Sequence, residues 1–240
     1  LETVARPFPG PVQVLIAGQV NVGKSSLVNA LLQDSQVAVD LLPMTTGSER
    51  YQLTNEGEPI AVLIDTPGIT SGHSSAWWHR QCAEVDCLVW VVAAHRADRE
   101  LDLRALETLR ENFRGQPQRS MPPVLVVVSH IDRLSPAREW SPPYNLIART
   151  QPKAAAIGAA LDHIAQELHL QEVEMVPVRL DQREHGYNID LLWALLKEYL
   201  DNAKQGRAQR LQLVARKTDW KKLMQQARGA GRLIKSTWQR

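Results

Sequence analysis

The sequence has little that could cross-link a fold. It has two cysteines in 240 residues, Cys82 and Cys87, with no CxxC pair and no cluster of histidines beside them. We therefore expect neither a disulfide framework nor a zinc module, and the two thiols fit a reducing compartment. The seven histidines show no metal-ligand spacing and are interpreted as surface or packing residues.

Long apolar runs are also missing. No stretch approaches the roughly 18 residues that a membrane span needs, and residues 1–10 lack the charged and apolar regions of a signal peptide. We therefore expect a cytoplasmic chain that crosses no membrane but could associate with the cytoplasmic face of one. Because it opens at Leu1 and its first methionine is Met44, we expect a processed or excised part of a longer protein.

Acidic residues are nearly missing from the end of the chain. Residues 204–240 hold 11 of the 28 basic residues but only one of the 26 acidic ones, and their apolar residues recur at helical spacing. We predict a globular domain at 1–203 and a basic amphipathic helix at 204–240. Its partner would be an anionic membrane surface or RNA. The alternative is that the helix packs on the acidic domain and leaves its charges solvated.

Short apolar runs alternate with helical patterns along the domain. Predicted strands lie at 12–17, 50–54, 60–64, 87–93, 124–128 and 174–178. Predicted helices lie at 24–33, 74–83, 101–113, 153–168 and 189–200. This alternation predicts an α/β fold with a six-stranded, mostly parallel sheet and helices on both faces. The first hairpin is expected at 50–64, and the proline-rich stretch 135–144 is expected to be an ordered excursion.

The strongest motif runs from Gly18 to Ser25 and reads G-x-x-x-x-G-K-S between a predicted strand and a predicted helix. In this context the pattern is typical of a phosphate-binding loop. Its backbone N–H groups would surround phosphates, Lys24 would reach the β- and γ-phosphates, and Ser25 would ligate magnesium. The expected nucleotide contacts here are Gly18, Asn21, Val22, Gly23, Lys24, Ser25 and Ser26.

A second motif, Asp-Thr-Pro-Gly, follows the predicted strand at 60–64. Asp65 would hold magnesium through water, and the Gly68 N–H would sense the γ-phosphate. Such a turn is by itself a common structural device, but its position after a buried strand favours the functional interpretation. Between the two motifs, a loop at 43–47 offers Thr46, preferred over Thr45, as a switch residue that ligates magnesium when the γ-phosphate is present.

These segments together resemble one family. Residues 18–31, which include Asn-Val-Gly-Lys-Ser-Ser, together with Thr-Thr and Asp-Thr-Pro-Gly, resemble the Era/TrmE-like branch of translation-factor-related, 50S ribosome-binding-type P-loop GTPases, over roughly residues 12–203. The resemblance implies binding of GTP and GDP with Mg²⁺. It also implies that Asn21 binds potassium near the phosphates; the alternative is that Asn21 only shapes the loop.

The family reads guanine with Asn- or Thr-Lys-x-Asp, and the corresponding run here is Ser129-His130-Ile131-Asp132. The resemblance implies that Asp132 accepts hydrogen bonds from guanine N1–H and its 2-amino group. Ser129 and His130 depart from the family pattern, so the contact to N7 and the stacking alkyl stem are altered. A further element, a backbone contact to guanine O6, would fall at the divergent residues Arg179, Leu180 and Asp181.

Ile69 bears on mechanism, and the pair Trp77-Trp78 bears on assembly. Ile69 stands where some GTPases have a water-orienting glutamine, and an aliphatic side chain cannot take that role. The pair Trp77-Trp78 lies near the switch region, where one ring is expected in the core and the other on a partner or homodimer surface.

The sequence thus predicts a magnesium-dependent GTPase with slow hydrolysis, using Lys24, Thr46 and Gly68 in catalysis, that regulates an anionic partner. One alternative is a nucleotide-binding scaffold or assembly module with negligible hydrolysis. Another is an ATP-using P-loop enzyme, which only the substitutions at Ser129 and His130 favour.

Overall fold

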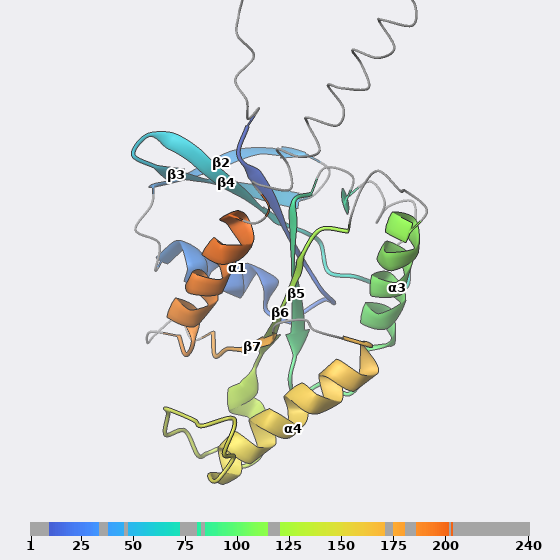
Figure 1. The fold of residues 1–240 in the computed structure, drawn as a ribbon, viewed down its shortest axis with the longest axis vertical. Coiled ribbons are helices and arrows are strands. Elements are labelled where there is room, and N and C mark those ends of the chain that lie inside the picture. The colour runs from blue at the N-terminus through green and yellow to red at the C-terminus, as the bar shows by residue number, and fades with distance from the viewer. Residues whose placement is uncertain are drawn as a thin grey trace, which may run out of the picture.

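The structure is a computed structural model. It describes residues 10–33, 38–45, 48–72, 81–82, 85–114, 121–170, 175–180, 186–201 and 203. These residues form one seven-stranded sheet with the strand order β2-β3-β4-β1-β5-β6-β7 and helices on either side (Figure 1). The α/β fold class predicted from the sequence is confirmed.

Five of the strands are parallel neighbours. They are β4 (Glu58–Asp65), β1 (Val12–Ala17), β5 (Cys87–Ala93), β6 (Val124–Ser129) and β7 (Met175–Pro177). Every residue of β5 is buried, as expected for a strand covered on both faces. Because parallel strands end at the same edge, the loops after β1, β4, β5, β6 and β7 meet there.

The sheet has seven strands, so the prediction of six was wrong. β2 (Ala38–Thr45) adds a seventh strand, antiparallel to β3 (Ser48–Asn55), which is in turn antiparallel to β4. Asp40 and Pro43 hide β2 in the sequence, but an edge strand tolerates both. β2 also includes Thr45, so part of the predicted switch loop is strand. The predicted hairpin between β3 and β4 is confirmed, and its turn residues Glu56 and Gly57 both have positive φ.

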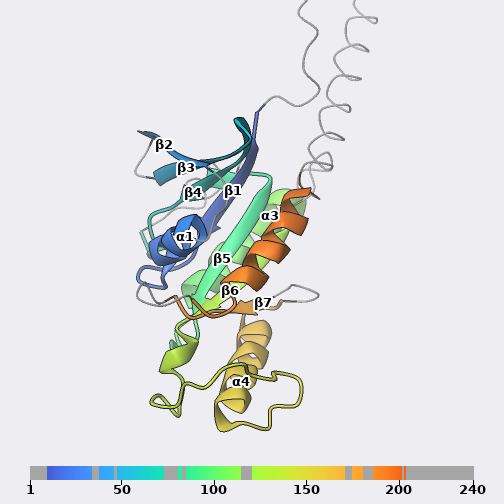
Figure 2. The same cartoon turned by 90° about the vertical axis from the view of Figure 1, so that its left-hand side faces the viewer.

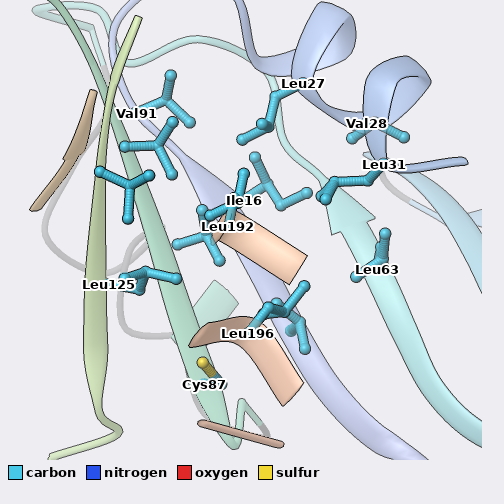
Figure 3. Packing of buried hydrophobic residues seen from close by; sticks show 14 of the residues in the cluster. Ile16, Leu27, Val28, Leu31, Leu63, Cys87, Val91, Leu125, Leu192 and Leu196 are labelled. Atoms are coloured by element: carbon cyan, nitrogen blue, oxygen red, sulfur yellow. The ribbon is translucent and has the colours of Figure 1, made fainter. Parts of the chain in front are cut away.

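The helices divide between the two faces of the sheet. Residues of α1 (Lys24–Gln33) and of the helical segment 189–201 pack on one face. Residues of α3 (Glu100–Arg114) and α4 (Pro152–Glu167) pack on the other. Figure 2 shows the segment 189–201, in orange, and Figure 3 shows its residue Leu192 beside Ile16 of β1, in the cluster that also includes Leu196 and Leu125.

Several predicted features fall partly or wholly outside the described residues. Of the predicted helix at 74–83, only 81–82 are described, and they are helical. Trp77, Trp78 and the extension 204–240 are outside. Within the part that the structure describes, no helix is long and apolar enough to cross a membrane. Trp90, in β5, is fully buried.

Candidate nucleotide site

The loop between β1 and α1 is shaped by three residues with positive φ. Gly18 (φ 146°) and Gly23 (φ 96°) adopt conformations that favour glycine. A Cβ atom on Gly18 would lie 2.2 Å from the Val91 carbonyl oxygen of β5. Asn21, at φ 61°, is left-handed, which asparagine tolerates better than most residues. The loop geometry therefore accounts for the glycine spacing of the motif and gives Asn21 a role in shaping the loop.

Lys24, the first residue of α1, is buried and bonded within the loop. Its Nζ donates to the Gln19 carbonyl oxygen at 2.8 Å, and only 7% of the residue is exposed. Burial lowers the pKa of the Lys24 ammonium, while the charges of Asp65 and Asp102 oppose that shift. The ammonium thus lies inside the loop that the sequence predicted to surround phosphates.

The end of β4 brings Asp65 to the start of α1. The Ser25 hydroxyl donates to Asp65 Oδ2 at 2.7 Å, and Asp65 Oδ1 is buried without a hydrogen-bond partner. Burial raises the pKa of the Asp65 carboxyl, although Ser25 and Lys24 favour the ionised form. A buried carboxylate oxygen that lacks a partner, beside a hydroxyl, suits a hard cation such as Mg²⁺. The two residues paired by sequence reasoning therefore fit a magnesium site.

Protein side chains alone would not complete that site. Among the described residues, no group of three or more His, Cys, Asp or Glu could hold a metal. The remaining oxygen ligands of an octahedral Mg²⁺ would have to come from water and phosphate, as is usual where Mg²⁺ is bound with a nucleotide. The predicted switch ligand Thr46 lies outside the described residues.

The Asp-Thr-Pro-Gly segment packs directly on the phosphate-binding loop. The Ile69 amide donates to the Gly18 carbonyl oxygen at 3.0 Å, and the Thr66 hydroxyl donates to the Ile16 carbonyl oxygen at 2.8 Å. A Cβ atom on Gly68 would lie 2.5 Å from Val20. The Asp-Thr-Pro-Gly segment is therefore in direct contact with the phosphate-binding loop, and the role of Gly68 towards the γ-phosphate stays a prediction. Ile69 is buried in the apolar cluster on the α3 side of the sheet.

At the end of β6, Ser129 faces the phosphate-binding loop. It is fully buried, and its hydroxyl donates to the Val22 carbonyl oxygen at 2.6 Å. The same oxygen also lies 3.2 Å from the Val92 carbonyl oxygen and 2.9 Å from His130 Nδ1, so the contact with Val22 is the shortest of the three. Ser129 therefore joins the predicted base-reading segment to the predicted phosphate-binding segment.

His130 and Asp132 follow in a tight turn. His130 is left-handed (φ 56°), and its ring lies edge-on to His95, with 5.1 Å between the ring centroids. Burial lowers the pKa of both imidazoles, and the nearby charge of Arg133 lowers them further. Asp132 lies in the short 3-10 helix η1 (Ile131–Arg133), which is anchored by the fully buried Ile131.

The segment after β7 completes the arrangement. A Cβ atom on Gly23 would lie 3.3 Å from Leu180 Cδ1 and 3.4 Å from His130 Cε1. The Arg179 amide and carbonyl pair with those of Tyr187. The structure therefore brings Leu180, His130 and the phosphate-binding loop together, while Asp181 lies outside the described residues.

Sequence reasoning missed a buried network behind the loop. Gln19 Nε2 donates to Asp102 Oδ2 at 2.8 Å, and Trp90 Nε1 donates to Asp102 Oδ1 at 3.0 Å. Burial raises the pKa of Asp102 to about 6. Outside this buried network, on the exposed side of the loop, Arg96 donates to the Val20 carbonyl oxygen at 2.7 Å. The only sequence signal was Asp102 on the apolar face of its helix, and no spacing rule connects it to Gln19.

The chain is similar in sequence to known GTPases. Residues 13–130 match the family model of the 50S ribosome-binding GTPase. The chain carries an Era-like P-loop GTPase domain. The chain is 31% identical to GTPase Era of Ectopseudomonas mendocina (strain ymp) over 185 residues, which are 74% of this chain and 58% of that protein.

Two further relatives define the extent of the likeness. GTPase Era of Pseudomonas aeruginosa (strain LESB58) is 28% identical over 198 residues, 80% of this chain and 55% of that protein. The crystal structure of Era in complex with MgGDPNP and nucleotides 1506–1542 of 16S ribosomal RNA matches with a TM-score of 0.52 at 24% identity. That match covers 80% of this chain and 57% of the other, and it shows the shared fold. This GTPase domain thus spans little more than half the length of these curated relatives.

Proposed function

We propose that the domain binds GTP and GDP with Mg²⁺ and hydrolyses GTP. The observation that carries the proposal is the pairing of Ser25 with Asp65, whose second carboxylate oxygen is buried without a partner. It lies beside the loop formed by Gly18 and Gly23. Such an arrangement suits a phosphate chain with a bound metal ion. Packing of the apolar core does not require it.

Each residue then has a defined task. The loop N–H groups and the N-terminus of α1 receive phosphate oxygens, and Lys24 exchanges the Gln19 carbonyl for the β- and γ-phosphates. Bound Mg²⁺ would neutralise charge on the phosphates, held by Ser25 directly and Asp65 through water. Gly68 and Thr46 would respond to the γ-phosphate, the former through its N–H and the latter as a ligand.

Asp132 is proposed to select guanine. Its carboxylate would accept hydrogen bonds from N1–H and the 2-amino group, which adenine does not offer. A fluorescence titration with GDP, GTP and ATP tests this: we expect guanine nucleotides to bind at least about tenfold better, and Asp132→Asn to erode the preference. Equal affinity for ATP would favour the ATP-using alternative.

Hydrolysis is proposed to be slow, on the order of 10⁻⁴ per second without a partner. Ile69 is buried and apolar, so it cannot orient water. If Asn21 binds potassium, replacing sodium with potassium raises the single-turnover rate, and Asn21→Ala abolishes the gain. A rate below detection in both salts would instead support the scaffold alternative.

The anionic partner is proposed to be RNA, contacted by residues 204–240. The observations that favour it are the 11 basic residues of that segment and the solved Era structure, which contains a fragment of 16S ribosomal RNA. Co-sedimentation of the chain and of a 1–206 truncation with structured RNA and with anionic vesicles, across a salt series, tests it. Retention by vesicles alone would assign a membrane surface, and no effect of truncation would make the segment structural.

A further inference from the structure

A fully buried lysine lies behind the segment proposed to read guanine. Lys153 is the second residue of α4, has no exposed surface and donates to three backbone carbonyl oxygens. These are the oxygens of Asp132 at 2.7 Å, Leu134 at 2.7 Å and Pro136 at 3.2 Å. An ammonium group has three N–H donors, so every one of them has a partner in the same loop.

The position of Lys153 is unfavourable for a helix. The N-terminus of a helix carries partial positive charge, so a cation in the first turn is destabilising there. Removing an ammonium from water is a further penalty unless strong acceptors replace the water. Neither α4 nor the apolar core therefore explains the residue. The contacts of Lys153 instead concern the loop that follows β6.

That loop carries Asp132. Ile131 anchors it in the core on one side, and Lys153 holds the Asp132 carbonyl on the other. With the backbone fixed on both sides, the direction of the Asp132 carboxylate is restricted before any ligand arrives. Figure 2 shows the rest of the loop folding back alongside α4, in the same yellow-green region of the chain.

Trp140 extends the same support to the second base-side segment. Its ring lies 5.9 Å from Lys153 Nζ and 5.0 Å from Arg179 Cζ, within the range of cation–π contacts. It also packs edge-on against Tyr144 and Tyr187. One aromatic ring thus connects the lysine behind Asp132 with the segment at 179–180.

We propose that Lys153 is a positioning residue for guanine recognition, acting by holding the backbone of Asp132 through its three carbonyl contacts. This inference rests on the proposed role of Asp132. It also explains how the segment remains ordered although His130 stands where a lysine is usual. The phosphates would lie at the loop 18–25, away from Lys153, so Lys153 is expected to act on the base and not on the phosphates.

The test measures affinities of the full 240-residue chain for GDP, ADP and xanthosine diphosphate (XDP) in Mg²⁺ buffer. The base of XDP has a carbonyl group where guanine has its 2-amino group. For Lys153→Met we expect GDP to bind about tenfold or more weakly, because three buried carbonyls lose their partner and the loop relaxes. ADP affinity, which depends on the phosphates, should change by less than about threefold. Lys153→Gln, which keeps two N–H donors, should give an intermediate loss.

Two controls separate positioning from simple destabilisation. Arg149→Ala removes an exposed ion pair with Asp162 between the same loop and the same helix, and it should leave the preference for GDP over ADP unchanged. Asp132→Asn should exchange GDP preference for XDP preference, and Lys153→Met added to it should weaken GDP binding little further. Thermal unfolding without nucleotide confirms that each variant is folded.

Each outcome has one meaning. A wild-type chain that binds GDP and ADP equally, or an Asp132→Asn variant that keeps its preference for GDP, overturns the proposed role of Asp132, and the role of Lys153 with it. A different result overturns the role of Lys153 alone: the wild type prefers GDP, Asp132→Asn loses that preference, and both Lys153 variants keep the full preference for GDP. Losses of GDP and ADP affinity by the same factor, or additive losses in the double variant, make Lys153 merely structural.

Discussion

The two ends of the candidate site are held in place by different kinds of contact. The phosphate end is the loop 18–25, and the base end is the segment 129–132, each named for the group that it is proposed to bind. At the phosphate end the loop is shaped locally, by Gly18, Asn21 and Gly23 in positive-φ conformations and by Lys24 bonded five residues back. At the base end the segment 129–132 has no glycine, and its support comes from distant chain: Val22, His95 and Lys153. Local support leaves a motif in the sequence, whereas distant support does not.

The largest effect is expected at Gly18. In Gly18→Ala the new Cβ would lie 2.2 Å from a β5 backbone oxygen that cannot move cheaply. We expect about 3 kcal/mol or more of lost unfolding free energy and GDP affinity lower by a factor of about 100. Urea unfolding and nucleotide titration measure the two effects.

Gly57→Ala is the matched control for that prediction. Gly57 also has positive φ, but an added Cβ would meet no atom within 4 Å. Its loss should be about 1 kcal/mol, with GDP affinity unchanged. If both substitutions lowered the free energy of unfolding and GDP affinity equally, backbone strain and not the contact with β5 would account for the effect of Gly18→Ala.

The next effect concerns magnesium. Asp65→Asn keeps the shape of the side chain and its contact with Ser25 but removes the charge expected to face the cation. We predict that Mg²⁺ strengthens GTP binding by the wild type and that this gain falls by about 2 kcal/mol, or roughly thirtyfold, in the variant. Titrations with Mg²⁺ and with EDTA measure it, and Glu58→Gln, an exposed position on the same strand, serves as the control. An undiminished gain in Asp65→Asn would refute the assignment.

A third prediction concerns pH and the support behind the loop. Burial raises the pKa of Asp102 to about 6, above the unfolded value near 4. The folded state therefore binds the carboxyl proton of Asp102 more tightly than the unfolded state does. The contribution of Asp102 to stability is greatest below pH 4 and declines as pH rises toward 6. Asp102→Asn should remove this decline, so the substitution is more harmful at pH 4 than at pH 7, by about 2 kcal/mol. Urea unfolding of both proteins across this range measures the difference.

The smallest effect is expected where the two ends of the site meet. Ser129→Ala removes the bond to the Val22 carbonyl, which leaves a buried acceptor unsatisfied. Net loss of such a bond is about 1 kcal/mol, so we expect GDP and ADP to bind about fivefold more weakly. Calorimetric titration measures both affinities. A loss confined to GDP would show that Ser129 reads the base directly and that the connection between the ends is weaker than we infer.

The sequence by itself determined the α/β order of elements, the phosphate-binding loop and the position of Asp65. These follow from short-range rules: the period of apolar residues, the positive φ that glycine permits, and the acid that follows a buried strand. Family resemblance placed Asp132, but the substitutions at Ser129 and His130 left no local rule for how that segment is held.

Only the tertiary structure decided the rest. β2 became a strand because β3 offered it an edge, despite Asp40 and Pro43. Gln19 meets Asp102 across 83 positions, and Lys153 meets three carbonyls across 17 to 21 positions. Such contacts depend on how helices pack on a sheet. A lysine or aspartate looks the same in the sequence whether the fold buries it behind a loop or exposes it to water.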